Sequence, residues 1–352
     1  MTPWVASMVD AGRVPRPRAS RPRTEAGAVN HRFVARRALF AVLSFYGVVT
    51  LVFLVLALGP DPTGTLRVAS GDLQTLLSAS DGGRSFLSRY AEFLWNVTTL
   101  DWGRSTAGFD QGPAVTALLA KHLPYTLTYA IPAVVVGVTG GIALGVFAAV
   151  NNGGRVDRAV QSVGYFAFGI PNFFFAEVAL FVLETELGLI DFTLGRIDPK
   201  FYVVGEAVDI WQPRHLMEFG VVAAILALSL VAGQLRYARS ECLEYVSADF
   251  VKLARAKGAS EFRVMAHVLR NAALPLLAMF LADLVTVLVV HVFVLEFVFN
   301  VPGIGQMGIQ AVKQRNLPFV VGITMTVAAV GVFANFVQDV GLGYVDPRTD
   351  AE

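Results

Sequence analysis

The sequence is poor in charge and in cysteine. Charged residues make up 16% of the 352 residues, while 55% are hydrophobic; a soluble globular chain carries about 25% charged residues. The single cysteine, Cys242, excludes an intrachain disulfide and a metal site built from several cysteines. This composition argues against an ordinary water-soluble enzyme and favours a membrane protein.

Motifs that carry catalysis are also missing. The sequence contains no phosphate-cradling GxxxxGK[ST] loop, no HExxH zinc motif and no GxSxG nucleophile elbow. The five histidines are scattered over different regions, which argues against a metal site: His31, His122, His215, His267 and His291. We therefore expect no catalytic residue, no metal and no cofactor in this chain.

Long apolar segments dominate what remains. A membrane helix needs about 20 predominantly apolar residues to cross the hydrocarbon core. The sequence predicts an all-α integral membrane fold with six transmembrane helices, at about 38–59, 123–150, 159–183, 216–235, 271–299 and 317–342.

Basic residues predict the orientation of these spans, because loops rich in Lys and Arg stay in the cytoplasm. With both termini cytoplasmic, Lys and Arg are about twice as dense in the inner segments as in the outer ones. We expect an Arg/Pro-rich, disordered cytoplasmic leader over 1–32, an extracytoplasmic insert over 60–122 and a cytoplasmic tail over 349–352, in a multi-pass protein of the cell membrane.

The loop between the fourth and fifth spans, 236–270, is long, basic and amphipathic. It predicts a short helix capped at its start by Ser247 or Asp249. Gly258 follows this helix where a left-handed C-terminal cap favours glycine. The helix would place four residues on one face, at i, i+3, i+4 and i+7: Phe250, Leu253, Ala254 and Lys257.

These residues resemble a known family. The run SADFVKLARAKGAS, followed by HVLRNAALP, is similar to the coupling loop of ABC-transporter permeases of the dipeptide/oligopeptide, binding-protein-dependent class. The segment EFVFNVPGIG, from Glu296 to Gly305, is similar to the family's segment after the fifth span. Asn335, Asp339 and the ending DPR at 346–348 also resemble its final helix and tail. The match covers residues 33–348 in order, as one permease domain.

The resemblance implies a permease subunit of an ATP-driven importer for di- or oligopeptides. Its expected partners are a second homologous permease, two cytoplasmic ATPases that hold ATP and Mg²⁺, an extracytoplasmic solute-binding protein and the lipid bilayer, but no nucleic acid. The cytoplasmic coupling helix would dock on an ATPase through a segment of ten named residues: Ser247, Asp249, Phe250, Val251, Leu253, Ala254, Arg255, Ala256, Lys257 and Gly258.

Two alternatives stay open. One keeps the ABC permease and changes the solute to a nickel chelate, glutathione or a short saccharide, since the separate binding protein sets most of the selectivity in importers of this type. The other is an ion-coupled secondary transporter that uses Asp283 and His291. Such transporters usually have two related halves with broken helices, and this sequence has no matching halves.

Four ionisable residues in the predicted spans are candidate functional residues: Glu177, Asp283, His291 and Glu296. Charged side chains there are costly and usually face protein or water. They could line a pathway or the interface of two permeases, or they could cap and pair helix ends within the bundle. We favour the second interpretation for Glu296 and leave Asp283 and His291 open.

The second predicted span carries glycine every four residues, at Gly137, Gly141 and Gly145. Small residues at this spacing let a second membrane helix approach closely. We expect this stripe to be a packing surface.

Overall fold

The computed structural model describes residues 31–58, 85–106, 112–190, 192, 209–286 and 290–345. Most of the predicted leader, all of the predicted tail and part of the predicted insert lie outside the described residues. Every element within these ranges is helical, apart from one isolated bridge between Arg104 and Ala114.

Within the described residues, the helices follow one another in twelve segments, with η2 a π-helical continuation of α6. Their bounds are α1 His31–Leu58, α3 Phe86–Thr98, α4 Val115–Val150, α5 Arg155–Gly169, α6 Asn172–Leu180, η2 Phe181–Glu186, α8 Pro213–Val246, α9 Asp249–Ala256, α10 Glu261–Thr286, α11 Val292–Phe299, α12 Ile304–Lys313 and α13 Leu317–Val345.

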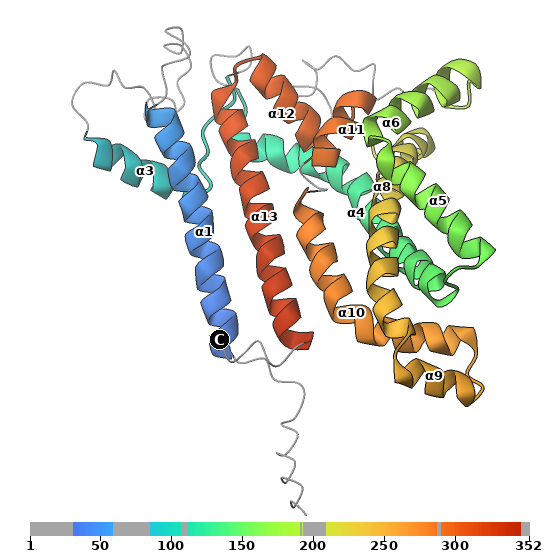
Figure 1. Ribbon diagram of the computed structural model, residues 1–352. Coiled ribbons are helices and arrows are strands. Elements are labelled where there is room, and N and C mark those ends of the chain that lie inside the picture. Colours follow the sequence, from blue (N-terminus) through green and yellow to red (C-terminus); the bar gives the residue numbers. More distant parts are fainter. Residues whose placement is uncertain are drawn as a thin grey trace, which may run out of the picture.

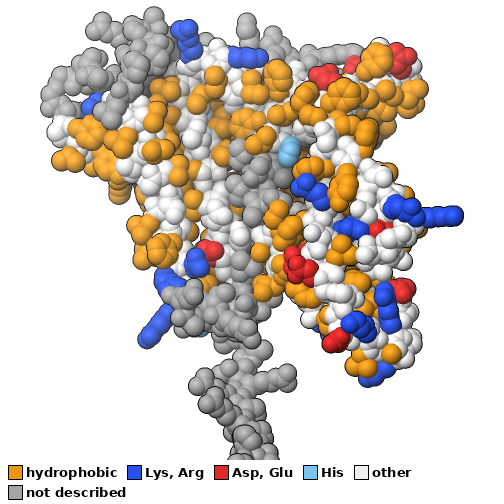
Figure 2. Space-filling view, in the orientation of Figure 1, with side chains coloured by type: hydrophobic (Ala, Val, Ile, Leu, Met, Phe, Trp, Pro, Cys, Tyr) orange, Lys and Arg blue, Asp and Glu red, His pale blue; other side chains and the backbone are white. Residues whose placement is uncertain are grey.

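The long helices run up and down between two ends of the molecule (Figure 1). At one end, the start of α1 is tied to the end of α13 by an ion pair between Arg37 and Asp339, 3.0 Å long. This end also carries α9. Helices α11 and α12 and the start of α13 lie at the opposite end. Lys and Arg side chains gather on the end with α9, while apolar side chains cover much of the surface between the ends (Figure 2).

Four described helices are long and apolar enough to cross a membrane, or up to six if each bent pair of helices counts as one span. The four are α1, α4, α8 and α13, which contain the first, second, fourth and sixth predicted spans. The third predicted span is divided between α5 and α6, which meet at 89°. The bend follows from Pro171, because the residue before a proline avoids helical geometry, and Ile170 is extended.

The fifth predicted span, 271–299, covers parts of two helices. Helix α10 ends at Thr286 and α11 begins at Val292, and residues 287–289 between them lie outside the described residues. Helix α11 then meets α12 at 77°. Apolar composition predicted a long apolar segment here but not its division between α10 and α11.

Helices α4 and α8 form the centre of the bundle, and the predicted glycine stripe lies between them. A Cβ atom added at any of these glycines would collide with α8. At this separation between α4 and α8, only glycine avoids the collision. The added atom would lie 2.5 Å from the Leu230 Cβ at Gly137, 2.6 Å from the Gln234 Cβ at Gly141 and 2.7 Å from the Ala238 Cβ at Gly145. The predicted packing role of the stripe is confirmed.

Candidate functional site

Helix α9 begins immediately after α8 without a side-chain cap. Its N-cap residue is Ala248, which is extended and makes no side-chain capping bond. Ser247 instead donates a hydrogen bond to the Glu244 carbonyl at the end of α8, 3.1 Å away. Asp249 is the first helical residue and pairs with Lys252 at 3.0 Å. The predicted cap by Ser247 or Asp249 is therefore wrong, although an acidic first turn suits the helix dipole.

The inner face of α9 is centred on Val251. Its side chain is 1% exposed and belongs to a cluster formed by the ends of α4, α8 and α10. Phe250 and Ala254 are half-buried beside it, whereas Leu253 is 56% exposed and Lys257 is exposed. Of the four residues predicted to share a face toward a cytoplasmic partner, Leu253 and Lys257 are therefore exposed as expected, whereas Phe250 and Ala254 are partly covered by the bundle.

Arg255 connects α9 to the two neighbouring helix ends. Its guanidinium donates to the carbonyl of Val150, the last residue of α4, at 3.3 Å. It also pairs with Glu261, the first residue of α10, at 3.5 Å. A cation suits the carbonyls at a helix C-terminus. Arg255 therefore links three helices at this end of the bundle.

Gly258 ends α9 in the left-handed conformation, with φ of +77°. Its N–H donates to the Arg255 carbonyl at 2.9 Å, and the Ala259 N–H donates to the Ala254 carbonyl at 3.0 Å. No atom lies within 4 Å of the place where a Cβ would be, so the backbone angle alone favours glycine here. The predicted C-terminal cap is confirmed.

The outward surface of this helical turn is apolar and basic. Leu253 on α9 is 56% exposed and Phe262, on the first turn of α10, is 78% exposed. Lys252, Ala256 and Lys257 are exposed on the same short segment. The acids Asp249 and Glu261 are exposed on the segment as well. We call Leu253 and Phe262 the exposed pair.

A buried ion pair that the sequence analysis missed lies near α9. Asp157, 1% exposed, accepts bonds from the Arg239 guanidinium at 2.8 and 3.0 Å and from the Gly153 N–H at 2.9 Å. Arg239 also donates to Asn152. Asp157 lies in the turn between the second and third predicted spans, outside both. The hydrogen bonds from Arg239 lower the pKa of its carboxyl group to about 2. This pair joins the start of α5 to α8. The sequence feature that could have indicated it is an acidic residue in the first turn of a helix.

At the opposite end, Glu296 of α11 is fully buried and surrounded by donors. Its carboxylate accepts from the Thr126 hydroxyl at 2.6 Å and the Tyr129 hydroxyl at 2.9 Å, both on α4. It also accepts from the backbone N–H groups of Gly305 at 2.6 Å and Gln306 at 3.0 Å, in the first turn of α12. Glu296 thus caps α12 and ties it to α4.

The other predicted intramembrane residues do not join this cluster. Glu177 is exposed on α6, and His291 is half-buried at the start of α11. Asp283 lies within α10, but its side chain is outside the described part of the structure. Among the described residues, no three His, Cys, Asp or Glu side chains come close enough to hold a metal ion.

A bundle of long apolar helices of this kind is typical of multi-pass membrane proteins. Residues 141–351 match the family model described as "Binding-protein-dependent transport system inner membrane component". The chain therefore belongs to this family, whose members are transport permeases and not catalytic subunits. The resemblance to permeases of the dipeptide/oligopeptide class is confirmed.

Relatives match along most of their length. The chain is 27% identical to the oligopeptide transport system permease AppB of Bacillus subtilis, over 90% of this chain and 99% of that protein. It is 29% identical to the di/tripeptide transport system permease DppB of Pseudomonas aeruginosa, over 90% of this chain and 98% of that protein. It is 31% identical to a putative peptide transport system permease of Brucella abortus, over 73% of this chain and 78% of that protein.

Proposed function

We propose that this chain is the membrane-spanning permease subunit of an ATP-driven ABC importer for di- or oligopeptides. The observation that carries the proposal is the match to peptide permeases over nearly their whole length. Its partners would be a second homologous permease, two cytoplasmic ATPases that hold ATP and Mg²⁺, and an extracytoplasmic binding protein. The relatives' names do not favour another solute or an ion-coupled transporter.

The proposed topology has six crossings with both termini in the cytoplasm. Helices α5 and α6 would form the third crossing and α10 and α11 the fifth, each bent or divided within the membrane. The gathering of basic side chains at the end with α9 supports this orientation (Figure 2). Trp95 and Trp211, 68% and 80% exposed, would lie near the outer interface, where indole rings are favoured.

The segment from Ser247 to Gly258 would be the coupling segment, which docks on an ATPase. Val251 fixes α9 to the bundle, and the exposed pair faces outward from it. Closure of the ATPases on ATP would displace α9. Arg255 of α9 bonds to the end of α4 and the start of α10, and Asp157 of α5 bonds to Arg239 of α8. The displacement would therefore be transmitted to four helices together: α4, α5, α8 and α10. Such a transition changes which side of the membrane the pathway faces.

Leu253→Asp tests the docking surface. It places a charge where we propose an apolar contact, and Leu253 is exposed in the free chain, so the fold should be unaffected. A buried leucine contributes about 1.5–3 kcal/mol, so we expect at least a tenfold loss of peptide uptake in proteoliposomes that contain the full complex. The ATPases should also be retained poorly on purification.

The matched control is Ser240→Asp, which adds the same charge at an exposed position of α8 outside the coupling segment. It should support uptake close to that of the natural chain. Normal uptake and normal ATPase retention by Leu253→Asp would refute the proposed docking surface.

A further inference from the structure

The turn between α4 and α5, residues 151–154, is held by two other helices toward the end of the bundle that carries α9 (Figure 1). From α9, the Arg255 guanidinium donates to the carbonyl of Val150, directly before the turn, at 3.3 Å. From α8, the Arg239 guanidinium donates to the side-chain oxygen of Asn152, within the turn, at 3.0 Å. The turn is therefore bonded to both α8 and α9.

The contact with α8 continues into the first turn of α5. Asp157 accepts two hydrogen bonds from Arg239, at 2.8 and 3.0 Å, and the two side chains are 1% and 14% exposed. The Gly153 N–H, within the turn, donates to the same carboxylate at 2.9 Å. Separating a buried ion pair leaves an uncompensated buried charge, which is strongly unfavourable. The pair is therefore a firm connection between α5 and α8.

Arg239 itself lies against the end of α4. A Cβ added at Gly145 of α4 would lie 2.9 Å from the backbone nitrogen of Arg239, so the two helices touch at this level without room to slide past each other. Two residues, Ser247 and Ala248, separate the end of α8 from the start of α9. The end of α8, α9 and the α4–α5 turn thus form a closed set of contacts, and we expect them to move as one body.

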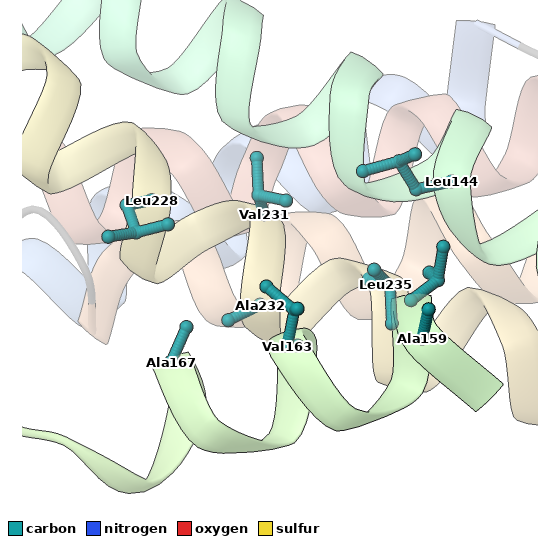
Figure 3. Close-up of a pocket in the computed structure, with 10 residues that line it drawn as sticks. Leu144, Ala159, Val163, Ala167, Leu228, Val231, Ala232 and Leu235 are labelled. Atoms are coloured by element: carbon teal, nitrogen blue, oxygen red, sulfur yellow. The ribbon is translucent and has the colours of Figure 1, made fainter. Parts of the chain in front are cut away.

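Further along α5, its contact with α8 within this chain is formed by apolar side chains. Ala159, Val163 and Ala167 of α5 point toward α8 across a hollow of about 280 Å³ (Figure 3). A close approach occurs at Gly164, where an added Cβ would lie 3.0 Å from the Leu235 Cδ2. Apolar contacts are not directional, whereas the ion pair has a defined geometry. The ion pair therefore fixes the position of α5 on α8.

We propose that Asp157 and Arg239 are positioning residues for coupling, which make α5 follow α9 when the ATPases displace it. Helix α5 lies on the α9 side of the bend at Ile170 and Pro171, and such a bend can serve as a hinge. Docking on the ATPases would not depend on the ion pair, because the exposed pair lies on α9 and α10. The inference rests on the proposed function and assigns one step of it to two residues.

Peptide uptake per ATP hydrolysed, measured in proteoliposomes that contain the full complex, tests the inference. Asp157→Asn keeps the shape of the side chain but removes its charge. The ATPases should be retained and should hydrolyse ATP, while the uptake per ATP falls roughly fivefold or more. A loss of folded protein alone would lower uptake and hydrolysis in parallel and leave this ratio unchanged. The matched control Glu244→Gln makes the same change at an exposed position of α8 and should keep the natural ratio.

Spin labels measure the relative motion of α5 and α8 directly. Ser162→Cys on α5 and Ser240→Cys on α8 place the labels at exposed positions, whereas Cys242 is buried. Addition of ATP should leave the distance between the labels unchanged in the natural background and should change it in Asp157→Asn. Arg239→Lys keeps the charge but loses the two-pronged contact, so we expect an intermediate uptake per ATP and an intermediate change in distance.

Equal uptake per ATP by Asp157→Asn and Glu244→Gln would overturn the inference, as would loss of the ATPases from Asp157→Asn. A label distance that changes with ATP in the natural background would also overturn it, and this measurement stands even if Asp157→Asn does not fold. The same response to ATP in both backgrounds would overturn it as well. The proposed function fails separately, when the natural chain itself retains no ATPase or takes up no peptide.

Discussion

At the residue scale, Glu296 shows how a buried acid can serve the fold of a membrane protein. It accepts four hydrogen bonds, two from hydroxyl groups of α4 and two from the backbone at the start of α12. The preference of the sequence analysis for a cap over a pathway role agrees with these contacts, although its partners could not be predicted. Thr126 and Tyr129 lie 170 and 167 residues away from it in the sequence.

Replacing Glu296 should destabilise the chain. Glu296→Ala leaves two buried hydroxyl and two buried N–H groups without their acceptor, and each unsatisfied group costs about 1–3 kcal/mol. We expect the midpoint of thermal unfolding in detergent, measured by tryptophan fluorescence, to be lower than that of the natural chain. The control Glu177→Ala removes an exposed acid and should change stability by less than about 0.5 kcal/mol. Equal midpoints for the two variants would contradict the capping role.

Gly258 allows a test of backbone conformation without a change in packing. A Cβ there meets no atom within 4 Å, but φ is +77°, so Gly258→Ala is strained by roughly 1 kcal/mol. Asparagine tolerates this conformation better than alanine. We expect peptide uptake to fall in the order glycine, asparagine, alanine at equal amounts of protein in the membrane. Alanine as active as glycine would show that the turn does not need this angle.

At the element scale, α9 was predicted in its place, and its partner-facing side was predicted in part. The amphipathic pattern and Gly258 indicated a short helix that ends at this position, and both are observed. Leu253 and Lys257 are exposed as the pattern predicted, but the pattern did not identify Val251 as the buried residue. Its burial depends on the ends of α4, α8 and α10, which meet α9 only in the folded chain.

The rotation of α9 predicts opposite behaviour for two neighbouring apolar residues. Val251→Ala removes buried atoms and leaves a cavity, which should cost about 1 kcal/mol or more, whereas Leu253→Ala removes only exposed atoms from the free chain. Limited trypsin digestion of the isolated permease should cleave within α9 faster in Val251→Ala and at the natural rate in Leu253→Ala. The reverse order would contradict the burial of Val251 and the exposure of Leu253.

At the scale of the whole molecule, length and apolar composition predicted four of the long apolar helices, since α1, α4, α8 and α13 cover the predicted segments, the first of them up to Leu58. Composition could not predict the two divided segments. The bend at Ile170 and Pro171 changes direction without changing hydropathy. Likewise, the Asp157–Arg239 pair joins residues 82 positions apart, which no local pattern reveals. The glycine stripe was predictable because its spacing alone defines a close helix contact.

The central claim is that this chain joins a peptide importer through its coupling segment. The most direct measurement is purification of the tagged natural chain and of Leu253→Asp from their membranes in mild detergent, with every retained protein identified by mass spectrometry. We expect the natural chain to retain a second permease, the ATPases and the binding protein, and Leu253→Asp to keep the second permease but lose the ATPases. A natural chain purified as a homo-oligomer without any ATPase would contradict it.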